Sequence, residues 1–383
     1  MAMILDGSNG VTFNDSSLQG AAASPFGLKN RIINGDMRIA QRGTSFSFGS
    51  AGGDYRYAAD RFATQDYTWS AGSNITISND TTVYPTGFSN SYKYATGATG
   101  LTLAAGGVQF IRHVIEGYNI ADCYTGNITL SFWVRASTTG QYNITLTNNS
   151  ILLEKYTTKN YTINAANTWE QKTITVDLSA GIASGGTWNT TNGEGLNLYF
   201  MVGAHANRTG NDGLNTWATG GSPNYSYQTT GCVNLSTIAN STFYITGVQL
   251  ERGSTATPFE RRLFGTELAL CQRYYWQQVS AAAATGTRAL GAGSYLQGGY
   301  VEWFAQFPIP MRSNPSVIST TVVGGYEIYR AGVSDSFDVV GLGSSNTNTA
   351  FLYNNTQVSG TAGQAGSVYC NSASTSVAFS AEL

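Results

Sequence analysis

Short runs in which apolar and polar side chains alternate recur between residues 29 and 262, and they constrain the fold more than any other feature. In one run, Ile128, Leu130, Phe132 and Val134 occupy every second position, so all four side chains point to one face of a β-strand. Similar runs occupy residues 142–146, 174–178 and 198–202. Because a single open sheet would leave a whole row of aliphatic side chains in water, we expect two packed sheets, an all-β jelly-roll β-sandwich.

The last strand of this sandwich is predicted over residues 243–252. Alternation over residues 243–250 changes register at Gly247, which indicates one β-bulge. Pro258 has no N–H to donate to a ladder, so the chain should leave the sheet before it.

A short helix is expected next, because apolar side chains then recur at steps of four, three and four residues. The sequence offers this apolar stripe no long partner helix. We therefore expect it to pack at a three-fold axis or under the following domain. The predicted oligomer contacts are Phe264, Leu268, Cys271 and Tyr275.

Three segments carry a resemblance to a known family. Residues 245–260 (ITGVQLERGSTATPFE) resemble the closing strand of carbohydrate-binding-module-like jelly rolls in bacteriophage virion proteins, and residues 271–277 (CQRYYWQ) resemble the helix that follows it. Residues 30–41 (NRIINGDMRIAQ) resemble the opening of the same modules. The resemblance implies a virion appendage protein, similar to a tail fibre, that assembles as a homotrimer.

The chain is long enough, at 383 residues, for two or three domains. We expect an N-terminal virion-attachment segment (residues 1–28), the jelly roll (29–262), a linking helix (263–280) and a small C-terminal β-domain (281–383). The first segment contains a short "VTF-x-D" opening similar to those of phage fibre proteins, and it should contact other virion proteins. In the last domain, Pro308, Arg312 and Pro315 form a pattern that resembles the small β-domains capping phage appendages.

The balance of charges excludes several classes of partner. Only 11% of the residues are charged and the formal net charge is −2, so no basic field is available for nucleic acid or an anionic membrane. The first residues lack the features of a signal peptide, and no run is long enough to span a bilayer. We therefore expect assembly in the host cytoplasm and a final location in the virion.

No motif for nucleotide binding, hydrolysis or zinc binding occurs in a supporting context. His113 alternates with Ile111 and Ile115 and is expected to pack inside a sheet, whereas His205 is expected at the surface of a loop. The acidic candidates for glycoside cleavage, which requires two nearby carboxylates, are isolated in sequence: Glu116, Asp122, Glu194 and Asp212. We therefore expect no enzymatic activity.

The four cysteines carry no metal or redox spacing. Free buried thiols are expected. A bridge between Cys123 and Cys232 is the alternative, which cytoplasmic assembly disfavours. No cofactor is expected except a structural calcium ion, which the resemblance allows, with Asp36, Asp60 and Glu251 as its donors.

A long polar insertion between Val202 and Val233 is the main candidate for binding. Aromatic faces stack on sugar rings, and amide and carboxylate groups bond hydroxyls. Subunit contact is an equally good explanation for the same aromatic residues. The predicted glycan-binding residues of the insertion are Trp217, Tyr225, Tyr227, Asn211 and Asp212, and Trp188 is a separate candidate of the same kind.

Two functions fit these observations. The first is a homotrimeric tail fibre or appendage subunit that adheres to host-surface polysaccharide through several weak sites. The second is a capsid, head-decoration or tail-adaptor protein whose jelly roll contacts only other virion proteins.

Overall fold

The computed structural model describes residues 29–48, 55–65, 75–150, 153–221, 225–281 and 288–383, together with three short strands near the N-terminus. Those strands, β1 (Ile4–Asp6), β2 (Gly10–Thr12) and β3 (Leu18–Gln19), form an antiparallel sheet. The rest of the expected attachment segment, residues 1–28, lies outside the described residues. Among the described residues, no helix is both long enough and apolar enough to cross a membrane.

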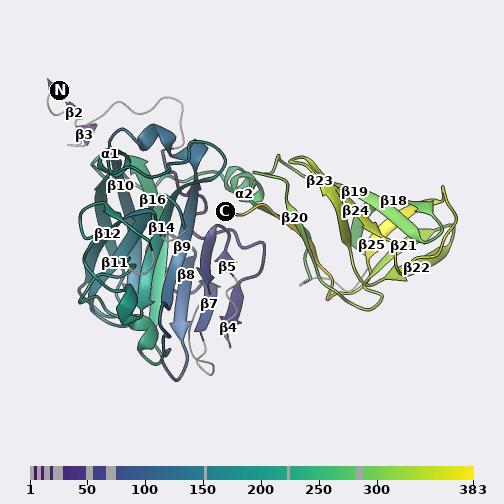
Figure 1. Ribbon diagram of the computed structural model, residues 1–383, viewed down its shortest axis with the longest axis horizontal. Coiled ribbons are helices and arrows are strands. Elements are labelled where there is room, and N and C mark those ends of the chain that lie inside the picture. Colours follow the sequence, from purple (N-terminus) through teal and green to yellow (C-terminus); the bar gives the residue numbers. More distant parts are fainter. Residues whose placement is uncertain are drawn as a thin grey trace.

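Residues 29–262 fold into a jelly-roll β-sandwich made of two antiparallel sheets (Figure 1). In spatial order, the six-stranded sheet contains β13 (Glu170–Asp177), β10 (Asn127–Ala136), β16 (Thr242–Arg252), β8 (Ser91–Thr96), β7 (Ile75–Asp80) and β4 (Ser45–Phe48). The seven-stranded sheet contains β15 (Ala218–Thr219), β12 (Lys155–Ile163), β11 (Gly140–Thr147), β14 (Glu194–Ala204), β9 (Val108–Glu116), β6 (Phe62–Gln65) and β5 (Tyr55–Ala59).

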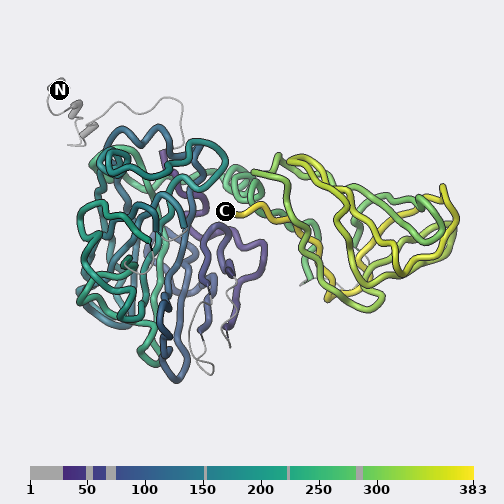
Figure 2. The backbone as a smooth tube through the Cα atoms, viewed as in Figure 1, coloured from purple at the N-terminus to yellow at the C-terminus, as the bar shows by residue number. Residues whose placement is uncertain are grey.

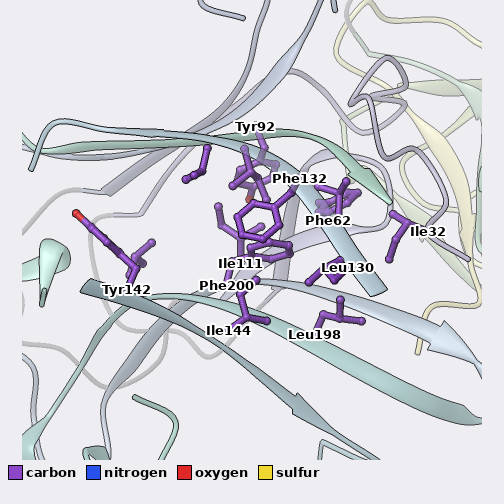
Figure 3. Packing of buried hydrophobic residues seen from close by; sticks show 14 of the residues in the cluster. Ile32, Phe62, Tyr92, Ile111, Leu130, Phe132, Tyr142, Ile144, Leu198 and Phe200 are labelled. Atoms are coloured by element: carbon purple, nitrogen blue, oxygen red, sulfur yellow. The ribbon is translucent and has the colours of Figure 1, made fainter. Parts of the chain in front are cut away.

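The core lies between these sheets and confirms the alternation that predicted them. Figure 3 shows Phe132 of β10 facing Phe200 of β14, and their ring centroids are 5.2 Å apart. The side chains at alternate positions of residues 128–134 are all buried, and each large apolar side chain so covered contributes about 1.5–3 kcal/mol. The predicted bulge is also present, because Gly247 has φ +59° and the register between β10 and β16 shifts across it.

Among the described residues of the sandwich, helical structure is limited to short pieces. Helix α1 (Leu178–Ala183), which directly follows β13, was not expected, because residues 29–262 were predicted to contain only strands and loops. Four 3-10 turns also occur, at Gly117–Asn119, Ala121–Cys123, Ala206–Arg208 and Leu235–Thr237. The jelly roll is therefore almost entirely strands and loops, as expected.

The linking segment is shorter as a helix than expected. Helix α2 (Phe264–Gln272) ends before Tyr275, which belongs to strand β17 (Tyr275–Val279) and pairs with Ser380. The predicted four-residue helical stripe is wrong at this position, because pairing with a distant strand outweighs the local spacing. Cys271 and Tyr275 are buried within the chain, Leu268 is half-buried, and Phe264 is 54% exposed.

The apolar side of α2 packs on the start of the jelly roll. Cys271 and Tyr274 form a cluster with Ile33 and Ile39, and Leu268 packs against it. This partner in the same chain corrects the expectation that Cys271 faces a three-fold axis. Of the four predicted oligomer contacts, Phe264 keeps the most exposed side chain.

Residues 275–383 form a second β unit with its own core. Strands β17, β26 (Val377–Ser380) and β20 (Ser316–Ser319) make one sheet. A seven-stranded sheet contains, in order, β22 (Val333–Phe337), β21 (Tyr326–Arg330), β25 (Ala365–Cys370), β18 (Arg288–Gln297), β19 (Tyr300–Gln306), β24 (Thr349–Asn354) and β23 (Gly341–Ser345). Trp303 and Phe337 are buried at its centre.

The last residues of the chain return to the junction between the two units (Figures 1 and 2). There Glu382 bridges the guanidinium groups of Arg42 and Arg61, with 2.8 Å between Arg42 Nη2 and its carboxylate. At the end of helix α2, Arg273 donates to the carboxylate of Glu116, the last residue of β9, at 2.5 and 3.0 Å. These ion pairs connect the linking segment and the second unit to the outer face of the jelly roll.

Arg312 also connects the end of the chain with the jelly roll. Its guanidinium donates to the carbonyl groups of Ala381 (2.7 Å), Glu382 (3.0 Å) and Asn192 (2.7 Å), the last of which belongs to the jelly roll. The neighbouring prolines fix φ on either side. The proline-flanked pattern noted in the sequence therefore forms part of this contact between the two β units, which we call the joint.

Candidate functional site

A pocket beside helix α1 holds the most favourable combination of groups for ligand binding in the jelly roll. The helix begins because Asp177, the last residue of β13, accepts hydrogen bonds from Ser179 N (2.9 Å) and Ala180 N (3.3 Å). A side chain that caps the first turn in this way stabilises a helix by about 1 kcal/mol. The cap places α1 at the end of the strand, where it forms one wall of the pocket.

Trp217 forms the opposite wall and its position is fixed. Its indole Nε1 donates to the carbonyl oxygen of Asp177 at 2.8 Å. The ring also lies against Gly181, where an added Cβ would come within 2.7 Å of Cε2. Behind it, Trp188 packs edge-on with ring centroids 5.3 Å apart. Trp217 is therefore held by contacts with both α1 and Trp188.

Polar groups complete the pocket, whose volume is about 460 Å³. Lys159 of β12 donates to Asn215 Oδ1 at 3.3 Å, and Asn215 N donates to Thr158 O, which attaches the loop to the strand. Backbone pairing of β15 with β12 fixes the same loop further along. The lining residues are Thr157, Lys159, Val176, Asp177, Ala180, Ala183, Ser184, Asn215, Thr216 and Trp217.

The ionisable groups of the pocket suit hydrogen bonding. The hydroxyl of Ser179 and nearby backbone N–H groups lower the pKa of Asp177, so its carboxylate stays ionised at neutral pH. Burial lowers the pKa of Lys159. Asp177 is the one acidic residue that lines this pocket, whereas glycoside cleavage requires two carboxylates. The arrangement offers an indole surface, an acceptor and several donors.

A second hollow lies near the start of the insertion and has a volume of about 450 Å³. It is lined by two of the predicted glycan-binding residues, Asp212 and Tyr225. The guanidinium of Arg208 lies 4.1 Å from the centroid of the Tyr225 ring. One face of this ring is therefore occupied by a cation within the chain.

The predicted residues do not form one common platform. Trp217 lines the pocket at α1, while Trp188 packs behind it and donates to Gly185 O. Tyr227 packs against Phe110, Tyr199 and Tyr225 at the outer face of the seven-stranded sheet. Asn211 is exposed and accepts a hydrogen bond from Thr230 N at 3.1 Å. The five insertion residues therefore do not form the single platform suggested by the sequence, because the insertion folds over two separate places.

Most of the acidic candidates for catalysis form ion pairs with arginine side chains. Glu194 pairs with Arg112 at 2.7 Å, Asp122 pairs with Arg31 at 2.7 Å, and Glu116 is held by Arg273. Asp212 stands in the second hollow, where it is the one acidic lining residue. None of these contacts brings two acidic candidates together in a described cavity.

The two histidines lie where the sequence suggested. His113 is buried, with its ring 4.7 Å from that of Phe62, and burial lowers its pKa well below the ordinary value. His205 begins the 3-10 turn at Ala206, and its side chain accepts from Asn207 N. All four cysteines are free thiols, so the alternative bridge between Cys123 and Cys232 is not formed.

The three carboxylates suggested for calcium are each engaged separately. Asp36 pairs with Arg38 at 2.5 Å, and Asp60 accepts from both the backbone and side chain of Gln41. Glu251 accepts from Thr257 N at 2.8 Å. In the part of the chain that the structure describes, no cluster of three or more His, Cys, Asp or Glu residues could hold a metal ion.

The segments that carried the family resemblance lie side by side. Asn30 Oδ1 accepts from Leu250 N at 3.0 Å, and Asn30 Nδ2 donates to Val248 O at 3.2 Å. Glu260 accepts from Asn30 N at 2.9 Å. Gly35 faces Val248 O so closely that any side chain there would clash with the strand. These hydrogen bonds attach residues 30–41 to strand β16, and the two motifs do not form the candidate site.

Sequence reasoning found Trp217 but missed its partners Lys159, Asp177 and Asn215. One local signal was present, because Asp177 followed by Ser179 before a small-residue run is a typical helix start. No comparable signal marks Lys159, which lies 58 positions before Trp217 and is brought to it by the pairing of β15 with β12.

No protein-family model matches this sequence, and no curated protein matches it. Several solved structures are similar to parts of the chain. The enzymatically active domain of bacteriophage CBA120 tailspike protein 4 is 14% identical with a TM-score of 0.29, covering 58% of this chain and 21% of the tailspike domain. This chain thus spans about a fifth of that domain.

A sugar-binding protein described as putative, from Bacteroides thetaiotaomicron, is 10% identical with a TM-score of 0.31, covering 58% of this chain and all of that one. A family 4 carbohydrate-binding module is 14% identical with a TM-score of 0.25, covering 55% and 95% of the two chains.

Proposed function

We propose that this protein is a non-catalytic glycan-binding subunit of a bacteriophage virion appendage, with host-surface polysaccharide as its ligand. The pocket between Trp217 and α1 carries the proposal. An indole stacks on the apolar face of a sugar ring, while Asp177, Lys159 and Asn215 supply the acceptor and donors that hydroxyl groups need. The chain as a whole has a formal net charge of −2, which suits an uncharged ligand.

Assignment to a virion appendage is supported by the resemblance of residues 30–41, 245–260 and 271–277 to phage modules. Three copies in a homotrimer would bring three weak sites to one repetitive surface, and linkage of sites raises avidity without any new contact. Weak individual binding is therefore sufficient for attachment.

The binding test uses the full chain on an array of neutral gluco-, galacto- and manno-configured oligosaccharides. Trp217→Ala should weaken binding about tenfold, since an aromatic contact contributes about 0.5–1.5 kcal/mol beyond its buried area. Trp169→Ala is the matched control. Trp169 is half-buried just before β13, about 26 Å from Asp177 along that strand, and its loss should leave binding unchanged.

Two results would overturn the proposal. If the wild-type protein binds no oligosaccharide on the array, glycan binding is refuted and the capsid or adaptor role is favoured. Release of reducing sugar from host envelope by the wild-type protein would show that it is an enzyme. Labelled antibodies on intact particles would then distinguish a tail from a capsid location.

A further inference from the structure

The second β unit carries a row of aromatic side chains on its outer surface. Along β19, the side chains of Val301 and Trp303 are buried in the core, so Tyr300 and Phe304 point outward. The register of the next strand places Phe351 opposite Phe304. Phe304 is 64% exposed. A contiguous patch of large apolar side chains on a surface marks an interaction site.

The rings form one continuous surface. Phe304 and Phe351 have centroids 5.5 Å apart, and Phe351 and Tyr353 have centroids 6.3 Å apart with planes 27° from parallel. Tyr300 stacks on Tyr353 at 5.4 Å with planes 6° apart. We call Tyr300, Phe304, Phe351 and Tyr353 the aromatic row.

Two glycines on the edge strand β23 leave room for two rings of this row. An added Cβ on Gly341 would lie 2.8 Å from Cζ of Tyr353, and one on Gly343 would collide with the ring of Phe351. The two rings therefore lie directly on the backbone of β23. One face of each ring is therefore covered by the strand.

A polar group lies within the row. Glu302 stands between Tyr300 and Phe304 on the outward side of β19, directly opposite Tyr353. Its carboxylate forms no ion pair or hydrogen bond with any described residue. A free carboxylate beside aromatic faces can accept hydrogen bonds from two neighbouring hydroxyl groups.

The charges of this unit decide what kind of partner fits. Residues 281–383 contain no lysine and three arginines. Arg312 belongs to the joint, Arg288 donates to Thr375 O, and Arg330 donates to Ser359 O and lies over the ring of Tyr295. With no cation directed at the row, polyanions such as nucleic acid or phosphorylated glycans have no counter-charge there.

We propose that the aromatic row is a second saccharide-binding surface, specific for an uncharged, hydroxyl-rich glycan chain. Sugar rings stack along Tyr300, Tyr353, Phe351 and Phe304, and Glu302 accepts hydrogen bonds from their hydroxyl groups. This surface belongs to a different β unit from the Trp217 pocket and does not depend on it.

The experiment measures binding of neutral gluco-, galacto- and manno-configured hexasaccharides to the full chain by calorimetry. Phe351→Ala and Tyr353→Ala should each weaken binding about tenfold, and Glu302→Gln should weaken it several-fold. Gly343→Val, which keeps every ring but lifts Phe351 from the strand, should have an effect similar to that of Phe351→Ala.

Tyr329→Ala is the matched control. Tyr329 is 47% exposed on β21, three strands away from β19 in the same sheet, which is about 14 Å. Its removal should leave binding unchanged. The thermal unfolding temperature of each variant is also measured. A variant that loses binding but unfolds at the wild-type temperature has lost the binding surface and kept its fold.

The two proposals fail separately. If saccharide binding is lost with Trp217→Ala and is unaffected by the row variants, the aromatic row is not a binding surface while the pocket stands. If the row variants lower the sedimentation mass and leave saccharide binding intact, the row is a contact between copies of the chain and the proposal is wrong. If no hexasaccharide binds the wild-type protein, both proposals are overturned.

Discussion

Replacement of Glu382 by glutamine should release the second β unit from the jelly roll. Its carboxylate lies between Arg42 and Arg61, whose side chains are 12% and 2% exposed. Burial alone would raise the pKa of Glu382, but the two guanidinium groups hold it below its ordinary value. Glutamine keeps the shape of the side chain and removes its charge.

The size of the effect follows from the geometry. At an effective dielectric constant of about 20, opposite unit charges separated by the 2.8 Å of the Arg42 pair attract by about 6 kcal/mol. Part of this is offset by the cost of burying the carboxylate. After the change, Arg42 keeps Asp60 at 3.6 Å, whereas Arg61 loses its carboxylate partner. Leaving a buried charge unpaired costs about 3–5 kcal/mol.

Two measurements test this expectation. Urea unfolding should show a free energy of unfolding lower by about 3–5 kcal/mol at pH 7. Small-angle scattering should show a larger maximum dimension once the units separate. Because the folded pKa of Glu382 is depressed, its contribution is present above the unfolded value of about 4.3 and is lost as the pH falls through the folded value.

Asp122→Asn is the control for this experiment. Asp122 pairs with Arg31 at 2.7 Å, but its side chain is 48% exposed, and exposed pairs contribute at most about 1 kcal/mol. If Glu382→Gln changes stability as little as Asp122→Asn does and leaves the scattering curve unchanged, this charge does not hold the joint.

Three further predictions concern stability, the pocket and assembly. Burial lowers the pKa of His113 well below its ordinary value, so the unfolded state takes up a proton below about pH 6.5. His113→Phe should therefore remove a loss of stability seen in urea titrations between pH 7 and pH 5. Gly181→Ala should displace the Trp217 ring, costing about 1–3 kcal/mol and weakening saccharide binding, which fluorescence and calorimetry would measure. Phe264→Ser, at the exposed end of α2, should lower the mass seen by light scattering from trimer to monomer; an already monomeric wild-type protein would contradict the trimer.

The strands could be predicted because burial of one face leaves a local pattern in the sequence. Alternation at residues 128–134 identified β10 and its core side, and Gly247 identified the bulge in β16. Tyr275 could not be placed correctly from a local pattern of this kind. Its spacing from Cys271 fits a helix, but it pairs with Ser380, 105 positions away. A contact at that distance has no signature in the residues around it.

The candidate site was predicted in part for the same reason. Composition and loop length pointed to the insertion, and Trp217 lines the pocket. The groups that make the pocket useful come from β12 and from the end of β13, 58 and 40 positions earlier in the chain. In the aromatic row, alternation in β19 marks two outward rings, but their continuation depends on the register with β24 and on glycines of β23.

The joint determines how the two proposed surfaces act on one polysaccharide. A flexible linker would spread the second surface over many positions, and the effective concentration of the second binding event would fall as the linker lengthened. The units are connected by the ion pairs of Glu382 and Arg273 and by backbone carbonyl groups that accept from Arg312. The separation between the Trp217 pocket and the aromatic row is then fixed, so a glycan long enough to reach both gains avidity within one chain, before any contribution from a trimer.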